Sequence, residues 1–413
     1  MNNKIYTLML PLVTLLLSCP IRAQADEVPE ELKDYSAYLT GDWGGARRNL
    51  ENRGIATDII YKFDVVGNVS GGIKRGIRAL DNLDVIFTLD GEKILGIKGL
   101  SAKVNLLNNM GSRPDNDLVG SSQGLNNIEV PSPTAKLYQA YLEQTLLENQ
   151  VSLLAGLYDL NSEFYVTDSS ALFIHSTFGI GTEMSQSGQN GPSIFPNTSV
   201  GTRVRLNPTK NIYIQTAILD GVSGAVNHPH GTHIRLDNND GWLLAGETGY
   251  TQQGATIAVG GWYYTEKSDH LALTGDKEHN NGSYIIGEKQ LYQESNDQGL
   301  VGFVRFGIAN GDVNEISYAW SAGFVYTGFL PGHDEGQLGF GITGAQPSSE
   351  YKKAALVSEG TIANAETTFE LTYSDKITPW LLLQPDIQYV INPGINKELE
   401  NALVLSTRFT IDF

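Results

Sequence analysis

The segment IATDIIYKFDVV (residues 55–66) decides the fold, because its side chains alternate between two faces with a period of two. One face carries Ile55, Thr57, Ile59, Tyr61, Phe63 and Val65. The other face carries Asp58, Lys62 and Asp64. Such alternation is typical of a β-strand that has one face against an apolar environment and the other against water.

The same pattern recurs to the end of the chain, as in LDVIFTLD (residues 83–90) and LVLSTRFTIDF (residues 403–413). About sixteen such segments can be counted. They lie near residues 55–67, 79–90, 99–108, 135–145, 150–158, 198–206, 210–219, 241–251, 253–265, 286–293, 299–309, 315–327, 335–345, 365–376, 379–391 and 402–413. Each is about ten residues long, which is the length that a tilted strand needs to cross a bilayer.

The connections between these segments alternate in length. Short ones follow the fourth, sixth, eighth, tenth and fourteenth segments, and long ones follow the third, fifth, seventh, ninth and thirteenth. Short turns on one rim and long loops on the other are typical of an outer-membrane barrel. The sequence therefore predicts an all-β fold, a transmembrane antiparallel β-barrel of about 16 strands with both termini at the short-turn, periplasmic rim.

The charges on the inward face of nearly every strand argue for a water-filled lumen. A soluble β-sandwich, the alternative fold, packs its inner faces into a dry core and would have to bury these charges. Aromatic residues near the strand ends, such as Trp262 and Trp380, are typical of the interfacial girdles of a barrel. After residue 25, the chain contains no run of about 18 apolar residues that would predict a membrane-spanning helix.

The first 25 residues are typical of a cleaved signal peptide. Lys4 precedes an apolar core, Leu8 to Leu17, and Ala23-Gln24-Ala25 is a small-x-small cleavage site. The only cysteine, Cys19, lies in this segment, and Pro20 after it argues against lipidation. Removing two of the 28 basic residues with the signal leaves 26 against 46 acidic ones, a net charge of about −20 that excludes nucleic acid as a partner.

Between the predicted signal and the first strand, residues 26–54 form an N-terminal periplasmic segment. Asp42 can cap a short helix, Ala46 and Leu50 share one face, and Gly54 is a stop signal. Arg47 and Arg48 would lie on the solvated face of this helix. Residues 55–413 would form the barrel.

The stretch DLNSEFYVTDSSALFIHSTFGIGTEMSQSGQNGPSIFPN (residues 159–197) has neither a strand nor a helix pattern. Structureless connections beyond about 15 residues are uncommon in compact domains unless they are functional. The sequence therefore predicts that this loop folds into the lumen and narrows the pore.

Arg203 and Arg205 follow this loop and share one face of the next strand, opposite Val204 and Leu206. We therefore expect the face with the two arginines to point into the lumen. A guanidinium donates several fixed hydrogen bonds to hydroxyl groups, which makes both arginines candidate filter residues. The alternative is a structural pair with nearby carboxylates.

Three residues at the start of the loop, Asp159, Asn161 and Glu163, could pair with these arginines and fix the loop. Phe164, Tyr165, Phe173 and Phe178 supply either stacking faces for sugars or, more often in such positions, a small anchoring core. Asp58, Lys62 and Asp64 face the same water, as do Lys103, Arg305 and Arg408.

Five segments resemble the carbohydrate-selective porins of the OprB family. They are TGDWGGARRNLENRGI (residues 40–55), NVSGGIKRG (68–76), LDVIFTLDGEKILGIKG (83–99), NSEFYVTDSSALFIHSTFG (161–179) and GPSIFPNTSVGTRVR (191–205). The resemblance implies a 16-stranded porin in the outer membrane of a Gram-negative bacterium, through which small sugars diffuse. It also implies that the terminal Phe413 is the signal that the barrel-assembly machinery recognises.

Other functions have weaker support. No G-x-S-x-G or H-E-x-x-H motif is present, and Asp168, Ser169 and His175 imitate a catalytic triad only by proximity in sequence. His228, His230 and His233 could bind a metal adventitiously, but we predict neither a metal site nor a cofactor.

The remaining alternatives concern transport and partners. A general or anion-biased porin, a secreted lectin or hydrolase, and a barrel enzyme stay open, as do a monomer and a homotrimer. Lys74, Arg75 and Arg78 fall in the predicted first long loop, where they would contact either the lipopolysaccharide of the outer membrane or the pore entrance.

Overall fold

The computed structural model describes residues 34–225, 227–234, 236–237, 239–295, 297–358 and 362–413. The chain from Ser36 to Phe413 forms one compact unit, and the account below concerns that unit. The predicted signal peptide, residues 1–25, lies outside the described residues.

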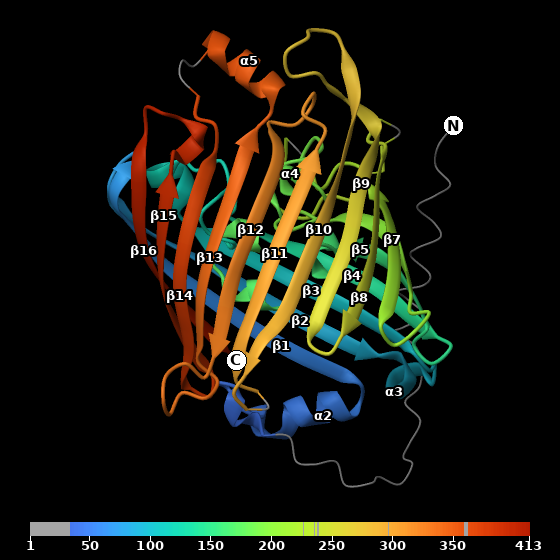
Figure 1. Cartoon of the computed structure of the whole chain (residues 1–413). Coiled ribbons are helices and arrows are strands. Elements are labelled where there is room, and N and C mark those ends of the chain that lie inside the picture. Colours follow the sequence, from blue (N-terminus) through green and yellow to red (C-terminus); the bar gives the residue numbers. More distant parts are fainter. Residues whose placement is uncertain (1–33, 226, 235, 238, 296, 359–361) are drawn as a thin grey trace. The chain divides into compact units, whose positions relative to one another are not determined.

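Sixteen antiparallel strands form a closed barrel in which each strand pairs with its neighbours in sequence and β1 pairs with β16 (Figure 1). The first eight are β1 Ile55–Gly72, β2 Gly76–Asp90, β3 Leu100–Gly111, β4 Thr134–Leu146, β5 Val151–Tyr158, β6 Ser199–Leu206, β7 Ile212–Asp220 and β8 Trp242–Gln252. The others are β9 Ala255–Asp269, β10 Lys277–Gln293, β11 Gly299–Ala309, β12 Ile316–Thr327, β13 Gln337–Pro347, β14 Glu366–Thr378, β15 Leu381–Ile391 and β16 Glu400–Asp412. The predicted 16-stranded barrel is confirmed.

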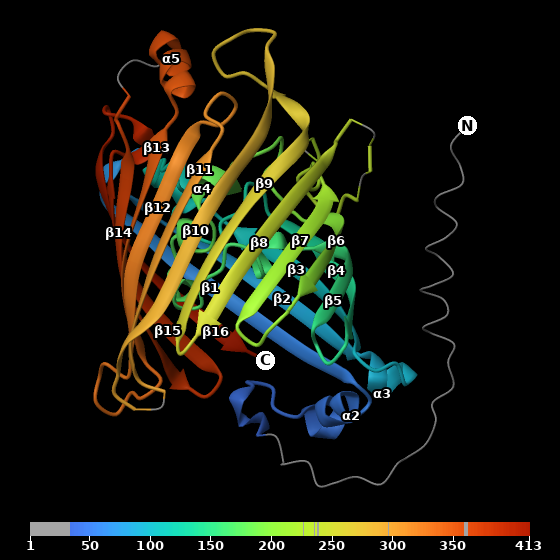
Figure 2. The same ribbon diagram turned by 45° about the vertical axis from the view of Figure 1, so that its right-hand side comes forward.

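The tenth strand begins nine residues before its predicted start at 286. Residues 277–285 carry little apolar alternation in KEHNNGSYI, yet they pair with β9 from Lys277 onward. β9 and β10 extend beyond their neighbours at the upper end of the barrel (Figures 1 and 2). The connection between them is consequently a seven-residue turn and not a long loop. The alternation is absent from residues 277–285 because paired strands that extend beyond the membrane need no apolar face.

The first connection is also shorter than predicted. β1 runs to Gly72 and β2 starts at Gly76, so only three residues join them. Lys74 and Arg75 lie in this turn, whereas Arg78 lies in β2. The strand signal was hidden by the glycines of NVSGGIKRG, two of which, Gly71 and Gly72, adopt positive φ.

Both ends of the barrel chain lie at the short-turn rim. Helix α2 (Ala46–Asn52) precedes β1, and Figure 1 shows it at the same end as the C-terminus. The Arg47 guanidinium donates to the carbonyl oxygens of Gly41 (3.1 Å) and Phe413, and it lies 3.9 Å from the Tyr38 ring centroid. Arg47 is therefore buried and not solvated as predicted, since it ties the N-terminal segment to the last residue.

Two further α-helices, α3 and α5, lie at the two ends of the barrel. α3 (Gly91–Leu95) follows β2 at the short-turn rim, where the Asp90 carboxylate accepts from the amides of Glu92 and Lys93. α5 (Ser349–Ser358) lies at the opposite end (Figure 1). No helix in the described residues is long and apolar enough to cross a membrane.

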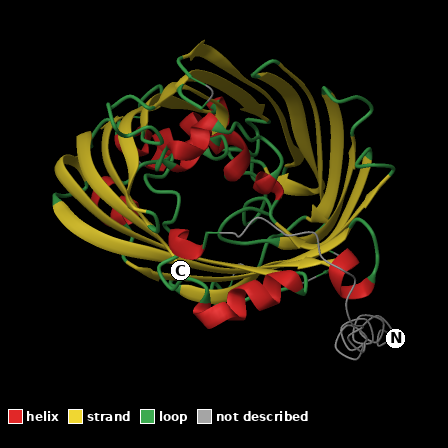
Figure 3. Ribbon diagram, turned by 90° about the horizontal axis from the view of Figure 1, so that it is seen from below, coloured by secondary structure: helices red, strands yellow, loops and turns green. Residues whose placement is uncertain are grey.

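The two faces of the wall differ as the alternation predicts. On β6 the inward Arg203 is 1% exposed, whereas the outward Val204 is 39% exposed. Viewed along the barrel, loops and short helices fill part of the space inside the ring of strands (Figure 3). The core of the molecule is thus formed where the infolded loops pack against inward apolar side chains of the wall, such as Leu154, Leu243 and Trp262.

Candidate functional site

Loop 159–197 lies inside the barrel, and its apolar side chains pack against the wall. It contains η4 (Leu160–Ser162), η5 (Ser169–Leu172), η6 (Ser176–Phe178) and α4 (Thr182–Ser185). Tyr165 stacks on Tyr284 of β10 with centroids 3.9 Å apart, and Phe173 and Phe178 pack on Phe303 of β11. Phe164 is also buried, so these loop aromatics form an anchoring core and present no open face to a sugar.

Carboxylates of the wall accept hydrogen bonds from the backbone amides of this loop. Glu370 of β14 accepts from Ile174 (2.6 Å) and His175 (3.1 Å). Glu247 of β8 accepts from the Tyr165 amide at 2.9 Å. Each such hydrogen bond contributes on the order of 1 kcal/mol to the stability of the loop. Sequence reasoning missed these acids, because only the fold brings residues so distant in sequence together.

Arg305 of β11 donates hydrogen bonds to backbone carbonyl oxygens of the same loop. One Nη donates to the carbonyl oxygens of Tyr165 (2.7 Å) and Gly179 (2.8 Å), and the other donates to those of Thr177 and Phe178. The guanidinium is buried and forms no ion pair with a carboxylate in the described part of the chain. Arg305 therefore holds residues 165–179 through hydrogen bonds to backbone carbonyls, and it also lies over the Tyr165 ring, 4.6 Å from the centroid.

At the entrance of the loop the predicted pairing is present. The Arg203 guanidinium makes a bidentate contact with Glu163, at 2.7 and 2.8 Å, and donates to Glu143 at 2.9 Å and to Ser152. Because Arg203 is almost fully buried, its donors serve protein acceptors and not the lumen water. This geometry matches the structural alternative considered for Arg203.

Asp159 and Asn161 fix the entrance without touching either arginine. The Asp159 carboxylate accepts from the Tyr138 hydroxyl (2.7 Å) and the Asn161 amide (2.9 Å). The Asn161 side chain donates to the carbonyls of Phe164 and Gly179, at 3.0 and 3.1 Å. Both side chains thus stabilise the fold of the loop.

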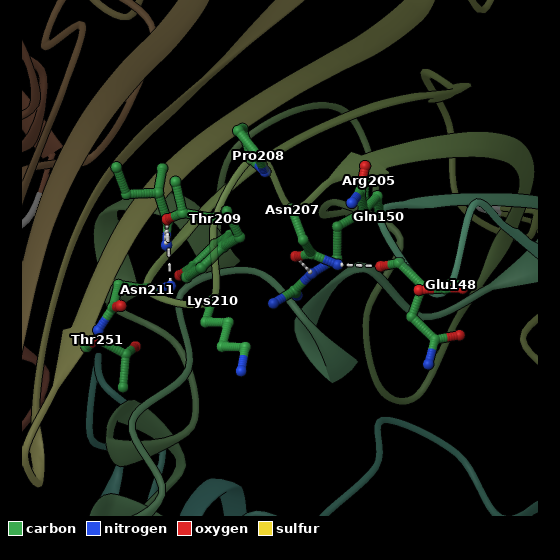
Figure 4. Close-up of a pocket in the computed structure, with 12 residues that line it drawn as sticks. Glu148, Gln150, Arg205, Asn207, Pro208, Thr209, Lys210, Asn211 and Thr251 are labelled. Atoms are coloured by element: carbon green, nitrogen blue, oxygen red, sulfur yellow. Dashed lines mark hydrogen bonds between the residues drawn. The ribbon is translucent and has the colours of Figure 1, made fainter.

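Arg205 lies two residues further along the same face and is partly exposed. Its guanidinium stacks on Tyr213, 4.3 Å from the ring centroid, and donates to Gln215 at 3.0 Å and Asn207 at 3.3 Å. It lines a polar cavity of about 570 Å³ at the short-turn end of the barrel. Figure 4 shows Arg205, Asn207 and Glu148 near one another, with Lys210, Asn211 and Thr251 to one side.

The three predicted residues of β1 separate into two groups. Asp64 is buried and pairs with Arg408 of β16, with N–O distances of 2.7 and 2.9 Å. Asp58 and Lys62 are half-buried, and neither side chain makes a hydrogen bond to another described residue.

A second loop, residues 112–133, also folds into the barrel, which the sequence did not predict. Asn126 donates to Asp64 at 2.6 Å, and Arg408 donates to Asn127 at 2.8 Å. Glu366 of β14 accepts from the amides of Ser122 (2.8 Å) and Gln123 (3.0 Å). This loop contains the short helix η3 (Asp115–Val119) and has the composition of an ordinary polar loop.

The two loops also contact each other. The Asn127 amide donates to the carbonyl of Ile174 at 2.8 Å, and the Gln186 side chain donates to the Ser122 carbonyl. The pair forms one continuous insertion, so movement of one loop would disturb the other.

Burial changes the titration of groups in loop 159–197. Desolvation raises the pKa of Glu183 to about 7, although the Tyr165 hydroxyl donates to it at 2.7 Å. Desolvation also lowers the pKa of His175 to about 3, so this imidazole is neutral at ordinary pH. His175 contacts Thr177 and Ser169 contacts Glu288, so they do not form the triad that their sequence order imitates.

The described residues include no group of three histidine, cysteine, aspartate or glutamate side chains that could hold a metal ion. In the segment 228–233, the His228 and His233 rings stack with centroids 5.5 Å apart, while His230 contacts the Pro133 carbonyl at 2.8 Å. These histidines thus engage each other and the backbone.

Known proteins resemble this chain along most of its length. Porin B of Pseudomonas aeruginosa is 24% identical over 94% of both chains, and the putative porin QuiX of Acinetobacter baylyi is 22% identical over 91% of this chain and 93% of its own length. The high-pH structure of Pseudomonas putida OprB superposes with a TM-score of 0.83 at 21% identity, over 93% of this chain and all of that one. The low-pH structure of that protein gives 0.61 at 17% identity, over 92% of this chain and all of that one.

At these identities the solved structures support the fold. The family is established separately, because the model of the carbohydrate-selective porins, OprB family, matches residues 74–413. This range includes both infolded loops and every strand except β1. The chain is therefore a member of the OprB family of carbohydrate-selective porins.

Proposed function

We propose that loops 159–197 and 112–133 together narrow the lumen, and that small sugars on their way through the barrel exchange hydrogen bonds with Arg205, Lys62 and Asp58 of its wall. The carrying observation is the anchoring of loop 159–197, whose amides and carbonyls are held by Glu370, Glu247 and Arg305 of the wall. A loop fixed in this way has a defined width. A defined width is what discriminates between solutes that carry no charge.

The polar groups left in water suit a neutral polyol. Lys62 and Asp58 present opposite charges on one strand, and Arg205 keeps one face of its guanidinium free beside the Tyr213 ring. Such groups exchange bonds with hydroxyls as readily as with water, so that a sugar meets a low barrier. Arg203, Glu163, Asp159, Asn161 and Asp64 would act indirectly, by positioning the loops.

An anion-biased pore is the second candidate, because Arg205, Lys62 and Lys103 are inward cations that form no direct ion pair with a carboxylate in the described residues. Sugar and anion preference are separable by measurement. In both cases the chain acts as a channel and not as an enzyme.

Location and partners follow from the same proposal. The chain is an outer-membrane porin by family, and we propose cleavage of residues 1–25 after Ala25. Phe413 is the proposed contact for the barrel-assembly machinery; its amide donates to the Ile59 carbonyl at 2.9 Å. Surrounding lipid and lipopolysaccharide are the expected partners of the outer wall, and the assembly is proposed as a monomer or homotrimer.

The test is single-channel conductance in planar bilayers with glucose, maltose or sucrose added. Wild type should show saturable block by one sugar, and Arg205→Ala and Lys62→Ala should each weaken that block roughly tenfold, the value of one charge-assisted hydrogen bond. Lys93→Ala on α3 removes an exposed cation outside the lumen and should leave the block unchanged. Conductance that is indifferent to every sugar but shifts its ion selectivity in Arg205→Ala would favour the anion-biased pore.

A further inference from the structure

An apolar groove lies on the outer wall of the barrel next to the turn that joins β1 and β2. It measures about 360 Å³ and is lined in part by Val65, Val69, Ile77 and Leu405. Ile77 is 71% exposed. Gly67 leaves the space open, because it is an outward position of β1 without a side chain.

The adjoining turn carries two exposed cations, Lys74 and Arg75. Neither forms an ion pair with any residue that the structure describes. Arg78, in contrast, donates to Asp117 at 2.7 Å and is not free. The groove reaches Gly76, the residue that follows Arg75, so the apolar surface and the positive charge are continuous.

The turn is held rigidly in place. The Asn68 side chain donates to the carbonyls of Gly71 (2.8 Å), Lys74 (3.0 Å) and Leu118 (3.1 Å). The amides of Ile73 and Lys74 donate to the same Leu118 carbonyl, at 2.9 and 3.1 Å. The cations therefore stand on a preorganised platform, which lowers the cost of binding a ligand.

The position of the β1–β2 turn indicates which class of ligand could bind there. The turn follows an odd-numbered strand and belongs to the long-loop rim, which faces the cell exterior in outer-membrane barrels. Lipid A, which fills the outer leaflet there, carries phosphate groups at the membrane surface and several acyl chains below. Gly67 pairs with Ile77, two residues after Arg75, so at about 3.3 Å per residue the groove begins roughly 7 Å along β2 from the cations, within the reach of an acyl chain.

We propose that the β1–β2 hairpin is a binding site for one lipid A molecule, with an acyl chain in the groove at Gly67 and a phosphate on Lys74 and Arg75. Basic side chains beside an apolar groove match this combination of charge and hydrocarbon. Glu400 pairs with Gly72, but by alternation it belongs to the lumen-facing series of β16, with Ala402 and Val404. The outward side of the turn thus keeps its positive charge.

The test is native mass spectrometry of the protein purified from outer membranes in detergent and titrated with hexa-acylated lipid A. Gly67→Leu fills the groove; a Cβ there meets its nearest atom at 3.7 Å, so the barrel tolerates it. Gly67→Leu and the double variant Lys74→Glu/Arg75→Glu should each weaken binding at least tenfold. Lipid A without phosphates should bind wild type as weakly as the double variant binds lipid A.

Two controls match these variants elsewhere on the barrel. Gly287→Leu places the same side chain on the outward face of β10, in the middle part of the strand, where a Cβ meets its nearest atom at 3.6 Å. Lys93→Glu/Lys98→Glu reverses two exposed charges near α3. Both should bind lipid A like wild type, and unchanged conductance should verify that all four proteins are folded.

Two results would overturn the proposal. If dephosphorylated lipid A, or a phospholipid, bound wild type as tightly as lipid A, the cations would have no role. If Gly67→Leu bound normally in a protein of normal conductance, the groove would not be the site.

Discussion

The entrance and the middle of loop 159–197 are each held by one buried arginine, but through different acceptors. Arg203 at the entrance binds two carboxylates, Glu163 and Glu143, which are 23% and 27% exposed. Arg305 in the middle donates only to backbone carbonyls, and its guanidinium also lies over the Tyr165 ring. Carboxylates that lose their arginine can take up water or a proton, whereas the buried carbonyls of Tyr165 and Thr177 accept from no other described donor. The difference predicts that the middle of the loop depends more strongly on its arginine than the entrance does.

The largest expected effect is that of Arg305→Met. It leaves the carbonyls of Tyr165 and Thr177 without a donor, and each buried unpaired group costs about 1–3 kcal/mol. The carbonyls of Phe178 and Gly179 keep Ser170 and Asn161 as donors. Amide exchange at Tyr165 and Ile174 should accelerate at least a hundredfold, about 3 kcal/mol at 1.36 kcal/mol per tenfold, and the channel should become wider and noisier. Arg305→Lys keeps the positive charge but not the planar guanidinium with its several donors. Its amide exchange rates should therefore lie between those of wild type and Arg305→Met. Exchange at the wild-type rate in Arg305→Met would mean that the apolar core alone holds the loop.

A smaller effect is expected for Arg203→Met, because water reaches Glu163 and Glu143. We expect a loss of about 2 kcal/mol in the local opening free energy near Phe164, below the 3–5 kcal/mol of a fully buried pair. Glu163→Gln removes one of the uncompensated charges, so the double variant should be less unstable than the sum of the two single ones by about 1 kcal/mol. Strict additivity in this cycle would show that the pair contributes no coupling.

The remaining effect is the only one that depends on pH, and it concerns Glu183 in the middle of the loop. Its folded pKa of about 7 lies above the ordinary value of 4.5, so its protonated form stabilises the loop fully below pH 4.5 and this contribution is lost as pH rises to about 7. Glu183→Gln should match wild type at pH 5 and exceed it at pH 8 by up to about 3 kcal/mol. Comparing the two proteins at each pH cancels the opposing titration of His175. An equal difference at both pH values would rule out titration of Glu183 in this range.

The strands could be predicted from the sequence because alternation is a local signal. It located fifteen strands within a few residues and failed at the start of β10, where the wall leaves the membrane. Loop 159–197 was predicted from its length, and its pairing with Arg203 from proximity along the chain. The partners Glu370, Glu247 and Arg305 were not predicted as anchors, because each lies on a strand that only barrel closure brings near. Loop 112–133 gave no signal, since its asparagines become anchors only beside Asp64 and Arg408.

The Asp64–Arg408 pair joins the first and last strands of the barrel across 344 residues of sequence, and Asn126 and Asn127 depend on it. Loop 112–133 therefore has its contacts with Arg408 only where β16 is docked on β1. The seam that closes the barrel is thus also one of the places where a loop that narrows the lumen is fixed.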